Sequence, residues 1–301
     1  MSLNSASQAP IILPLSAIPK DRDFDVKDSS FFLKHAQLPS PQTVRSEARA
    51  QYLAGIRIDK RKHFDPAGLN LSPPPVIFES MGLFVKWGRR AQLSEGQTLY
   101  AVRRYLKNEV PVPEVYGWRT DGEEVFIYME AIAGPTLEKS WDGLTPEDHV
   151  RICGELRKIF DNLRRLEQDP QERFIADTGP FKSVKEFHDW FAFLYRRPMA
   201  DPHSVPIEPF RHILADDMGI KFTQGDLHRS NIILTASNPP KVASVVDWEQ
   251  SAWMPAYWED RKAHWTADYE GDWSEKYLPM ILNQYTDTWE PWDYYTTSIG
   301  C

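Results

Sequence analysis

The chain has 301 residues, 42 % hydrophobic and 26 % charged, and this composition predicts a globular fold with room for a large core. The formal net charge is -8 and no basic stripe is visible, so we expect no nucleic-acid partner. Two cysteines, Cys153 and Cys301, form neither a disulfide framework nor a metal motif, which indicates a reducing, cytoplasmic setting. The apolar segment 9–18 is short and interrupted by prolines, so we expect no membrane partner.

The first quarter of the chain is expected to begin as a flexible arm. Residues 1–27 carry small polar residues and then prolines. Two short helices are expected next, at 30–37 and 41–54, because prolines separate two stretches of modest helical periodicity. They open an N-terminal lobe that we place at residues 28–130.

The rest of this lobe is expected to be rich in strands. Four strands are predicted in two hairpin-like pairs, 76–79 with 83–87 and 114–119 with 123–130. Asp121-Gly122 joins the second pair and tolerates positive φ. Between the pairs, Ser94 is expected to cap a helix with apolar residues at helical spacing.

Residues 131–301 are expected to form a larger, mainly helical lobe. Thr145 and Ser183 are each followed by an acid three residues later, so both predict the start of a helix. A third helix is expected at 208–217, and helices are expected again after Pro255. Short strands are expected between them, at 221–223, 232–234 and 242–246. The fold class is therefore α+β in two lobes, with a hinge near 129–134.

One polar loop carries the residues that we single out for chemistry. Asp226 and Asn231 lie five residues apart in a loop between two apolar, strand-like segments. Asp247 follows sixteen residues after Asn231, at the end of another apolar segment. A carboxylate that accepts a hydroxyl proton and hard oxygen ligands for Mg²⁺ are the groups that phosphoryl transfer requires.

At these residues the sequence resembles the aminoglycoside-phosphotransferase and choline-kinase superfamily, relatives of the protein kinases. The loop is similar to the family's H-G-D-x-x-x-x-N, and Val246-Asp247-Trp248 is similar to its metal-binding strand. The resemblance implies a protein-kinase-like fold, with Asp226 as the catalytic base and Asn231 and Asp247 as Mg²⁺ ligands. The run 253–259 looks like the fungal branch of that family.

The resemblance continues upstream in the same order. Lys86, in Leu83-Phe84-Val85-Lys86, looks like the lysine that contacts the α- and β-phosphates of ATP. Glu95 looks like its ion-pair partner. The hinge residues Met129, Glu130 and Ala131 would hold the adenine ring through their backbone groups. Singly, each residue has a simpler structural explanation, but their joint occurrence in order favours the kinase-like fold.

Two positions depart from the family pattern. Gln224 stands where the loop usually has a histidine that organises it, although glutamine also offers a donor and an acceptor. We interpret Glu79-Ser80-Met81-Gly82 as the turn over the nucleotide phosphates, and its single glycine offers few backbone amides.

Three functions are compatible with the sequence. The first is an ATP- and Mg²⁺-dependent kinase acting on a hydroxyl of a small molecule, with the substrate near aromatic residues. The candidate substrate contacts are Trp253, Tyr257, Trp258, Trp265 and His228, the last of which we expect to be structural rather than catalytic. The second is a binding or regulatory pseudokinase. The third is an enzyme of the same fold in which Asp226 and His228 perform acid/base chemistry on a natural product. The sequence does not predict the oligomeric state.

Overall fold

The computed structural model describes residues 9–56, 73–170, 181–204, 209–267 and 271–299. The chain divides into two compact units. We call residues 16–139 and 231–249 the sheet unit, and residues 1–15, 140–230 and 250–301 the helical unit. Among the described residues, no helix is both long and apolar enough to cross a membrane.

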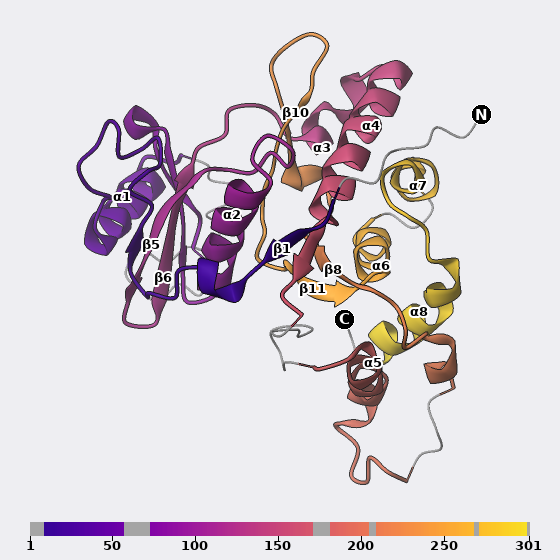
Figure 1. Cartoon of the computed structure of the whole chain (residues 1–301). Helices are drawn as coiled ribbons and strands as arrows, with labels where there is room; N and C mark the ends of the chain where they lie inside the picture. The colour runs from indigo at the N-terminus through magenta and orange to yellow at the C-terminus, as the bar shows by residue number, and fades with distance from the viewer. Residues whose placement is uncertain (1–8, 57–72, 171–180, 205–208, 268–270, 300–301) are drawn as a thin grey trace. The chain divides into compact units, whose positions relative to one another are not determined.

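A five-stranded antiparallel sheet forms the centre of the sheet unit (Figure 1). The strands follow the order β2 (Phe24–Asp25), β5 (Val115–Asp121), β6 (Glu124–Glu130), β4 (Leu83–Gly88) and β3 (Val76–Phe78). Both predicted hairpins are confirmed. Gly122 has a φ of 62° between β5 and β6, a conformation that glycine adopts without steric cost.

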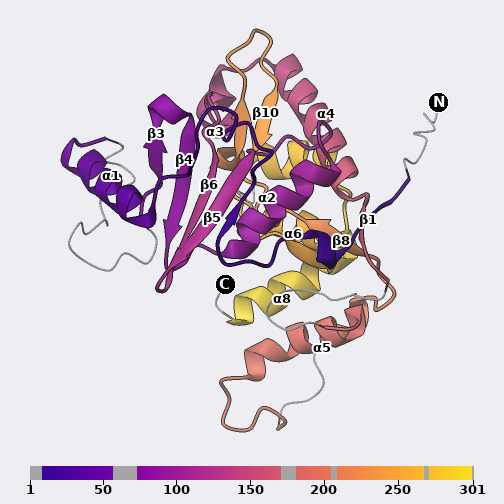
Figure 2. The ribbon, with the colours of Figure 1, turned by 60° about the vertical axis from the view of Figure 1, so that its left-hand side comes forward.

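Helices α1 (Pro41–Leu53) and α2 (Leu93–Tyr105) cover opposite faces of this sheet (Figure 2). Consecutive residues of β6 point to opposite faces. Phe126 therefore packs in the core cluster that includes residues of α1, while Ile127 lies within 3.4 Å of the position that a Cβ on Gly96 of α2 would occupy. The sheet is therefore buried on both sides.

Two expected helical features of this unit differ in the structure. Residues 30–37 form turns rather than a helix, because Ser30 bonds through its backbone N–H and hydroxyl to the Glu114 carboxylate of another segment. Helix α2 begins at Leu93 with Gln92 as the N-cap residue, so Ser94 lies inside the helix instead of capping it. The helix at 41–54 is confirmed, with Ser40 accepting a hydrogen bond from the Thr43 amide at its start.

The sheet unit also contains the hairpin of β9 (Ile232–Leu234) and β10 (Val242–Val245). The Val245 amide donates to the Pro111 carbonyl over 2.9 Å, and Leu234 donates to Pro135 over 2.9 Å. A Cβ on Gly134 would lie 2.0 Å from the Leu234 carbonyl oxygen, so only glycine permits this close approach. These contacts fix the strand that ends immediately before Asp247.

Helices and two small sheets make up the described part of the helical unit. Its helices are α4 (Pro146–Leu163), α5 (Val184–Phe193), α6 (Trp258–Trp265), α7 (Leu278–Ile281) and α8 (Trp289–Ile299), and the short α3 (Leu137–Ser140) spans the division between the units. Its strand pairs are β1 (Ile11–Leu13) with β7 (Leu166–Gln168) and β8 (Ile220–Thr223) with β11 (Ala252–Pro255).

Two predicted helix starts of this unit are confirmed, whereas the helix expected at 208–217 is wrong. The capping box at Thr145 is confirmed, and Ser183 accepts from the Glu186 amide at the start of α5. In place of a helix at 208–217, of which residue 208 lies outside the described residues, there is only a 3-10 turn at Arg211–Ile213. The Arg211 side chain donates to the Leu214 carbonyl, which a continuing helix would use to accept a backbone amide.

Part of the expected N-terminal arm belongs to the sheets. Ile11–Leu13 pairs in parallel with Leu166–Gln168, and Phe24–Asp25 pairs with β5 of the sheet unit. A single short strand carries too weak a pattern to be recognised without its partner.

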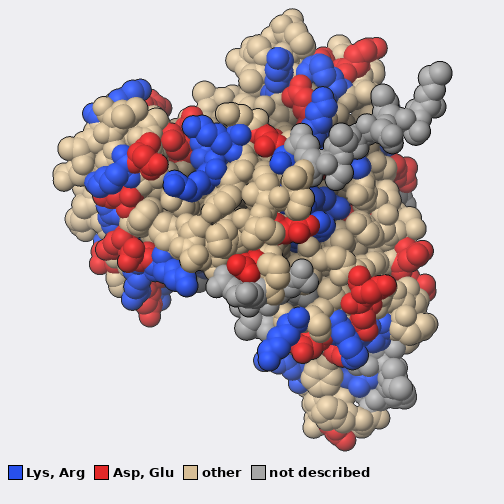
Figure 3. All heavy atoms as spheres, in the orientation of Figure 1, with Lys and Arg blue, Asp and Glu red and all other residues tan. Residues whose placement is uncertain are grey.

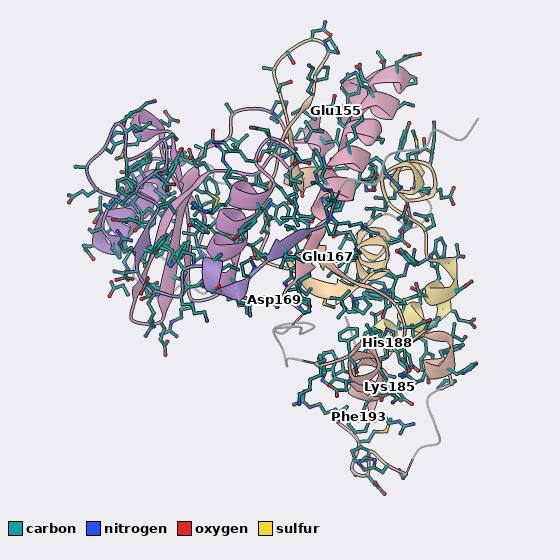
Figure 4. The ribbon with its side chains drawn as sticks, viewed as in Figure 1. Glu155, Glu167, Asp169, Lys185, His188 and Phe193 are labelled. Atoms are coloured by element: carbon teal, nitrogen blue, oxygen red, sulfur yellow. The ribbon has the colours of Figure 1, made fainter. Side chains whose placement is uncertain are left out.

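Aromatic side chains fill the core between α5, α6 and α8. The cluster includes Phe187, Phe191, Tyr257, Trp292 and Tyr295. His188 of α5, labelled in Figure 4, is completely buried in this unit and stacks on Tyr257 at 5.7 Å between ring centroids. Burial lowers the pKa of His188 to about 4, although a hydrogen bond with Asp216 acts in the opposite direction.

On the face drawn in Figure 3, acidic and basic side chains are interspersed.

Candidate functional site

In the sheet unit, Lys86 lies at the centre of three carboxylates. Its Nζ is 2.7 Å from Asp247 Oδ1, 2.8 Å from Glu249 Oε2 and 2.9 Å from Glu95 Oε2. The contacts with Asp247 and Glu249 are hydrogen bonds, whereas Glu95 is in ion-pair range without hydrogen-bond alignment to Oε2. The structure thus brings Asp247 together with Lys86 and Glu95, although Asp247 lies far from both in the sequence.

Burial and charge act against each other in this cluster. Burial alone would lower the pKa of Lys86, but Glu95 and Asp247 outweigh it and raise that pKa. The Glu95 side chain is only 2 % exposed, and its burial raises the pKa of the carboxyl while Lys86 offsets part of the effect. The Lys86 ammonium is held in a fixed position by these carboxylates. Phosphate oxygens of a ligand can bind it by replacing one or more of the carboxylates as its hydrogen-bond partners.

Backbone contacts hold Asp247 at this position. Asp247 has a φ of 60°, in the left-handed region that side chains other than glycine rarely adopt, although aspartate tolerates it better than most. The next amide, of Trp248, donates to Glu95 Oε1 over 3.3 Å. Just before, the Val246 amide donates to the Asn231 carbonyl over 2.9 Å, so the chain at Asn231 lies beside the end of β10.

The expected hinge residues end strand β6. Met129 is buried and pairs with Phe84 of β4, the strand of Lys86. The Glu130 amide donates to the Glu114 carbonyl over 2.8 Å, and the Ala131 amide donates to the Gly82 carbonyl over 2.9 Å. These two amide donors are therefore already engaged within the sheet unit.

The turn at Glu79–Gly82 does not have the position that we expected for a phosphate turn. It contains a 3-10 turn at Glu79–Met81, and its Gly82 carbonyl is bonded to Ala131 beyond the end of β6. Lys86 follows Gly82 by four residues along β4. At the rise of a β-strand, this separation is roughly 13 Å. The antiparallel register therefore places this turn at the hinge end of the sheet and away from Lys86.

In the helical unit, a buried carboxylate holds the loop that contains Asp226. Glu259, at the start of α6, is 1 % exposed and accepts from the Gln224 amide over 2.7 Å and the Gly225 amide over 3.1 Å. Burial raises the pKa of Glu259 to about 7, although the bond from Gln224 acts in the opposite direction. Glu259 thus satisfies two successive backbone donors just before Asp226.

The first residues of the loop have little freedom to change. Gly225 has a φ of 80°, and a Cβ there would lie 2.5 Å from the Gln250 carbonyl oxygen. The fully buried Gln224 uses its side-chain Oε1 to accept from the Asp226 amide over 2.8 Å. Glutamine therefore supplies a side-chain bond that orients the loop, as expected from its donor and acceptor groups.

His228 has contacts within the loop itself. Its amide donates to the Asp226 carbonyl over 2.7 Å, and its Nδ1 lies 2.8 Å from Ser230 Oγ and accepts from the Ser230 amide over 3.2 Å. Because Nδ1 is an acceptor, the proton of the neutral ring lies on Nε2. These bonds favour a structural role for this histidine.

The candidate substrate aromatics lie in different environments. Trp253 and Tyr257 are buried, at 5 % and 0 % exposure, and pack in the core of the helical unit. Trp258 is partly buried against the same cluster. Trp265 is exposed and contributes to a cavity of about 600 Å³ in this unit, which Trp289 and Trp292 also line. A cavity of this volume admits a small organic molecule.

The family of the chain follows from a comparison with protein-family models. Residues 79–295, well over half of the chain, match the model described as "Phosphotransferase enzyme family". The chain belongs to this phosphotransferase family. The matched region includes every candidate site residue given above. A comparison with curated proteins found no match.

Solved structures extend this result to the fold of the phosphotransferase. Aminoglycoside phosphotransferase APH(4)-Ia is 12 % identical, with 83 % of each chain covered and a TM-score of 0.50. ADP-bound APH(2'')-Ib is 15 % identical, covering 70 % of this chain and 74 % of its own, with a TM-score of 0.49. The streptomycin–ATP complex of APH(2'')-IIa is 14 % identical, covering 81 % and 87 %, with a TM-score of 0.47. The likeness to APH(4)-Ia confirms the α+β, protein-kinase-like fold.

The sequence patterns do not single out two residues that contact the candidate residues. Glu249 is the third carboxylate on Lys86, and Glu259 holds the loop before Asp226. Both residues directly follow a tryptophan, in Trp248-Glu249 and Trp258-Glu259. We find no other feature in the neighbouring sequence that the two residues share. Their partners lie far away in the sequence, so the residue types alone indicate nothing more than surface acids.

Proposed function

We propose that this phosphotransferase is a small-molecule kinase that transfers the γ-phosphate of ATP to a hydroxyl group. The observation that carries the proposal is the cluster of Lys86 with Glu95 and Asp247. It provides a fixed positive charge for phosphates beside a carboxylate that can bind a metal ion. Membership of the phosphotransferase family supports a reaction in which a phosphate group is transferred.

The proposed reaction assigns one role to each polar group. The oxygen of the acceptor hydroxyl forms a bond to the γ-phosphorus, the bond from phosphorus to the bridging oxygen breaks, and ADP leaves. Asp226 accepts the hydroxyl proton. Lys86, held by Glu95, stabilises negative charge on the phosphates. Asp226 precedes Asn231 by five residues in one loop, which supports their use in the same reaction.

The residues present fit a divalent cation. Asn231 and Asp247 offer an amide oxygen and a carboxylate oxygen, which are the hard donors that Mg²⁺ prefers. Carboxylate oxygens of Glu95, Asp247 and Glu249 lie within 4.8 Å of one another, so the cluster can concentrate cation-binding oxygens. A bound Mg²⁺ would neutralise phosphate charge there. We assign Asn231 and Asp247 as its ligands.

Adenine binding at 129–131 would differ from the expectation based on the sequence. Because the Glu130 and Ala131 amides already donate within the sheet unit, the ring would be held by carbonyl groups and apolar contacts of this stretch. The second candidate function is a pseudokinase that binds a partner or a ligand without turnover, and Gln224 in place of the usual loop histidine favours it.

Thermal unfolding with and without Mg·ATP tests the first step. A ligand that binds only the native state raises the unfolding midpoint. We expect Mg·ATP to raise the midpoint of the native chain and of Asp142→Asn, an exposed aspartate that serves as the matched control. Asp247→Asn should lose the shift. Absence of any shift in the native chain would exclude the ATP-dependent reaction.

Turnover separates the kinase from the pseudokinase. We expect ADP to form in the presence of a hydroxylated acceptor, and Asp226→Ala to abolish its formation while Mg·ATP still raises the unfolding midpoint. Binding without ADP formation for a broad panel of alcohols would favour the pseudokinase. Undiminished turnover in Asp226→Ala would show that another group takes the proton.

A further inference from the structure

One arginine of the candidate loop is held by two tryptophan rings. The guanidinium carbon of Arg229 lies 5.1 Å from the ring centroid of Trp141 and 5.9 Å from that of Trp273. Both tryptophans are buried, at 9 % and 4 % exposure, and belong to the helical unit, as Arg229 does. Cation–π contacts of this kind orient a guanidinium without consuming its N–H donors.

The rings around Arg229 support one another. Trp141 stacks on His149 at 4.0 Å and meets Trp273 edge to face at 5.3 Å, with 87° between the ring planes. The Trp141 carbonyl lies 3.0 Å from His149 Nε2, and Tyr277 packs against both Trp141 and His149. The tryptophans are therefore fixed by neighbours other than Arg229, so the position of the guanidinium is preorganised.

The guanidinium of Arg229 has no anionic partner in the part of the chain that the structure describes. No carboxylate there lies in ion-pair or hydrogen-bond contact with it, although the protein carries 43 acidic and 35 basic residues besides histidine. For comparison, Arg211 and Arg261 of the same unit each pair with an aspartate. A half-buried guanidinium presents a planar fork of N–H donors that matches the two oxygens of a carboxylate or phosphate.

We propose that Arg229, held by Trp141 and Trp273, is a binding subsite for an oxyanion, a carboxylate or a phosphate group of a ligand. Arg229 follows Asp226 by three residues in the loop, and the bond between the His228 amide and the Asp226 carbonyl makes that connection tight. This inference rests on the proposed function in one respect. If the chain is a kinase, its hydroxyl acceptor carries an acidic group, or Arg229 contacts the nucleotide phosphates.

Thermal unfolding with benzoate and benzamide tests the subsite directly. The two probes have the same ring and differ in the presence of a planar anion. We expect benzoate to raise the unfolding midpoint and benzamide, or sodium chloride at the same ionic strength, to leave it unchanged. Arg229→Gln should lose the benzoate shift and Arg229→Lys should keep a smaller one, because lysine keeps the charge without the fork. Arg157→Gln, which removes an arginine paired with Asp161, is the matched control and should keep the full shift.

The inference is overturned if benzoate and inorganic phosphate both leave the midpoint unchanged, or if the shift survives in Arg229→Gln. The unfolding midpoint of each variant without ligand shows whether it is folded. Two further measurements on Arg229→Gln show whether the oxyanion belongs to the nucleotide or to the acceptor. Weakened Mg·ATP binding in Arg229→Gln assigns the subsite to the nucleotide, whereas unchanged Mg·ATP binding with lost benzoate binding assigns it to the acceptor. A benzoate shift in a chain that does not bind Mg·ATP would retain the subsite and exclude the kinase.

Discussion

Two buried titratable groups of the helical unit should give the stability of this protein opposing pH dependences. Glu259 has a pKa raised to about 7 from an ordinary value of 4.5. Between these values the native state binds a proton that the unfolded chain has released, so raising the pH through this window lowers the free energy of unfolding. His188 has a pKa lowered to about 4 from 6.5. Between those values only the unfolded chain binds the proton, so lowering the pH reduces the free energy of unfolding.

The two windows overlap from pH 4.5 to 6.5. Each group contributes a slope of about 1.4 kcal/mol per pH unit there, with opposite sign, so their sum is close to zero. We expect Glu259→Gln to reveal the slope of His188, with the free energy of unfolding falling by roughly 2 kcal/mol between pH 6.5 and 5 relative to the native chain. His188→Gln should reveal the opposite slope, with a comparable gain over the same interval.

Urea unfolding at pH 5, 5.5, 6 and 6.5 measures these slopes. Both substitutions lower stability at every pH, because each removes a buried contact, but the prediction concerns only the difference in slope. The double variant Glu259→Gln with His188→Gln should recover the pH dependence of the native chain. Parallel pH profiles for the native chain and the Glu259→Gln variant would show that the Glu259 carboxyl is ionised throughout, and would refute the reasoning.

Two further substitutions test the local geometry. Gly225→Ala should lower the free energy of unfolding by more than the roughly 1–2 kcal/mol of a left-handed backbone, because its Cβ would also meet the Gln250 carbonyl. Gly122→Ala, with a φ of 62° and open space, should cost only that backbone term, and equal losses in urea unfolding would contradict the contact. Lys86→Gln should cost about 3 kcal/mol at pH 7 because it leaves the buried Glu95 charge without its partner. Part of this loss should be recovered at lower pH, because burial raises the pKa of the Glu95 carboxyl and a protonated Glu95 no longer needs the lysine. A loss independent of pH would argue against an electrostatic origin.

Local patterns in the sequence predict the elements that need no distant partner. The capping residues Thr145 and Ser183 mark two helix starts, and Asp121-Gly122 marks the main hairpin. Apolar runs on either side of that turn, at 115–118 and 125–129, predict both of its strands. These signals involve residues within a few positions of one another, so the chain carries them without reference to the rest of the fold.

Elements that depend on distant segments are missed or misplaced by the same patterns. The strand Ile11–Leu13 exists because Leu166–Gln168 lies beside it, and residues 30–37 lose helical structure to a contact with Glu114. The turn at Glu79–Gly82 is predicted correctly as a turn, but its distance from Lys86 depends on the register between β4 and β6. Register is a property of a pair of strands, so neither strand specifies it alone.

Local sequence sets which residue types are available for chemistry and their order along the chain. The joint occurrence of five polar residues in a fixed order is enough to single them out in the amino-acid sequence, although no one of them is informative by itself: Lys86, Glu95, Asp226, Asn231 and Asp247. Which of the charges are balanced depends on the folded chain. Folding surrounds Lys86 with three carboxylates and buries Glu259 under two backbone amides, while Arg229 meets two tryptophan rings and no acid among the described residues. Charge balance depends on distances of a few ångströms between segments that can be far apart in the sequence, as Lys86 and Asp247 are, and no local pattern encodes such distances.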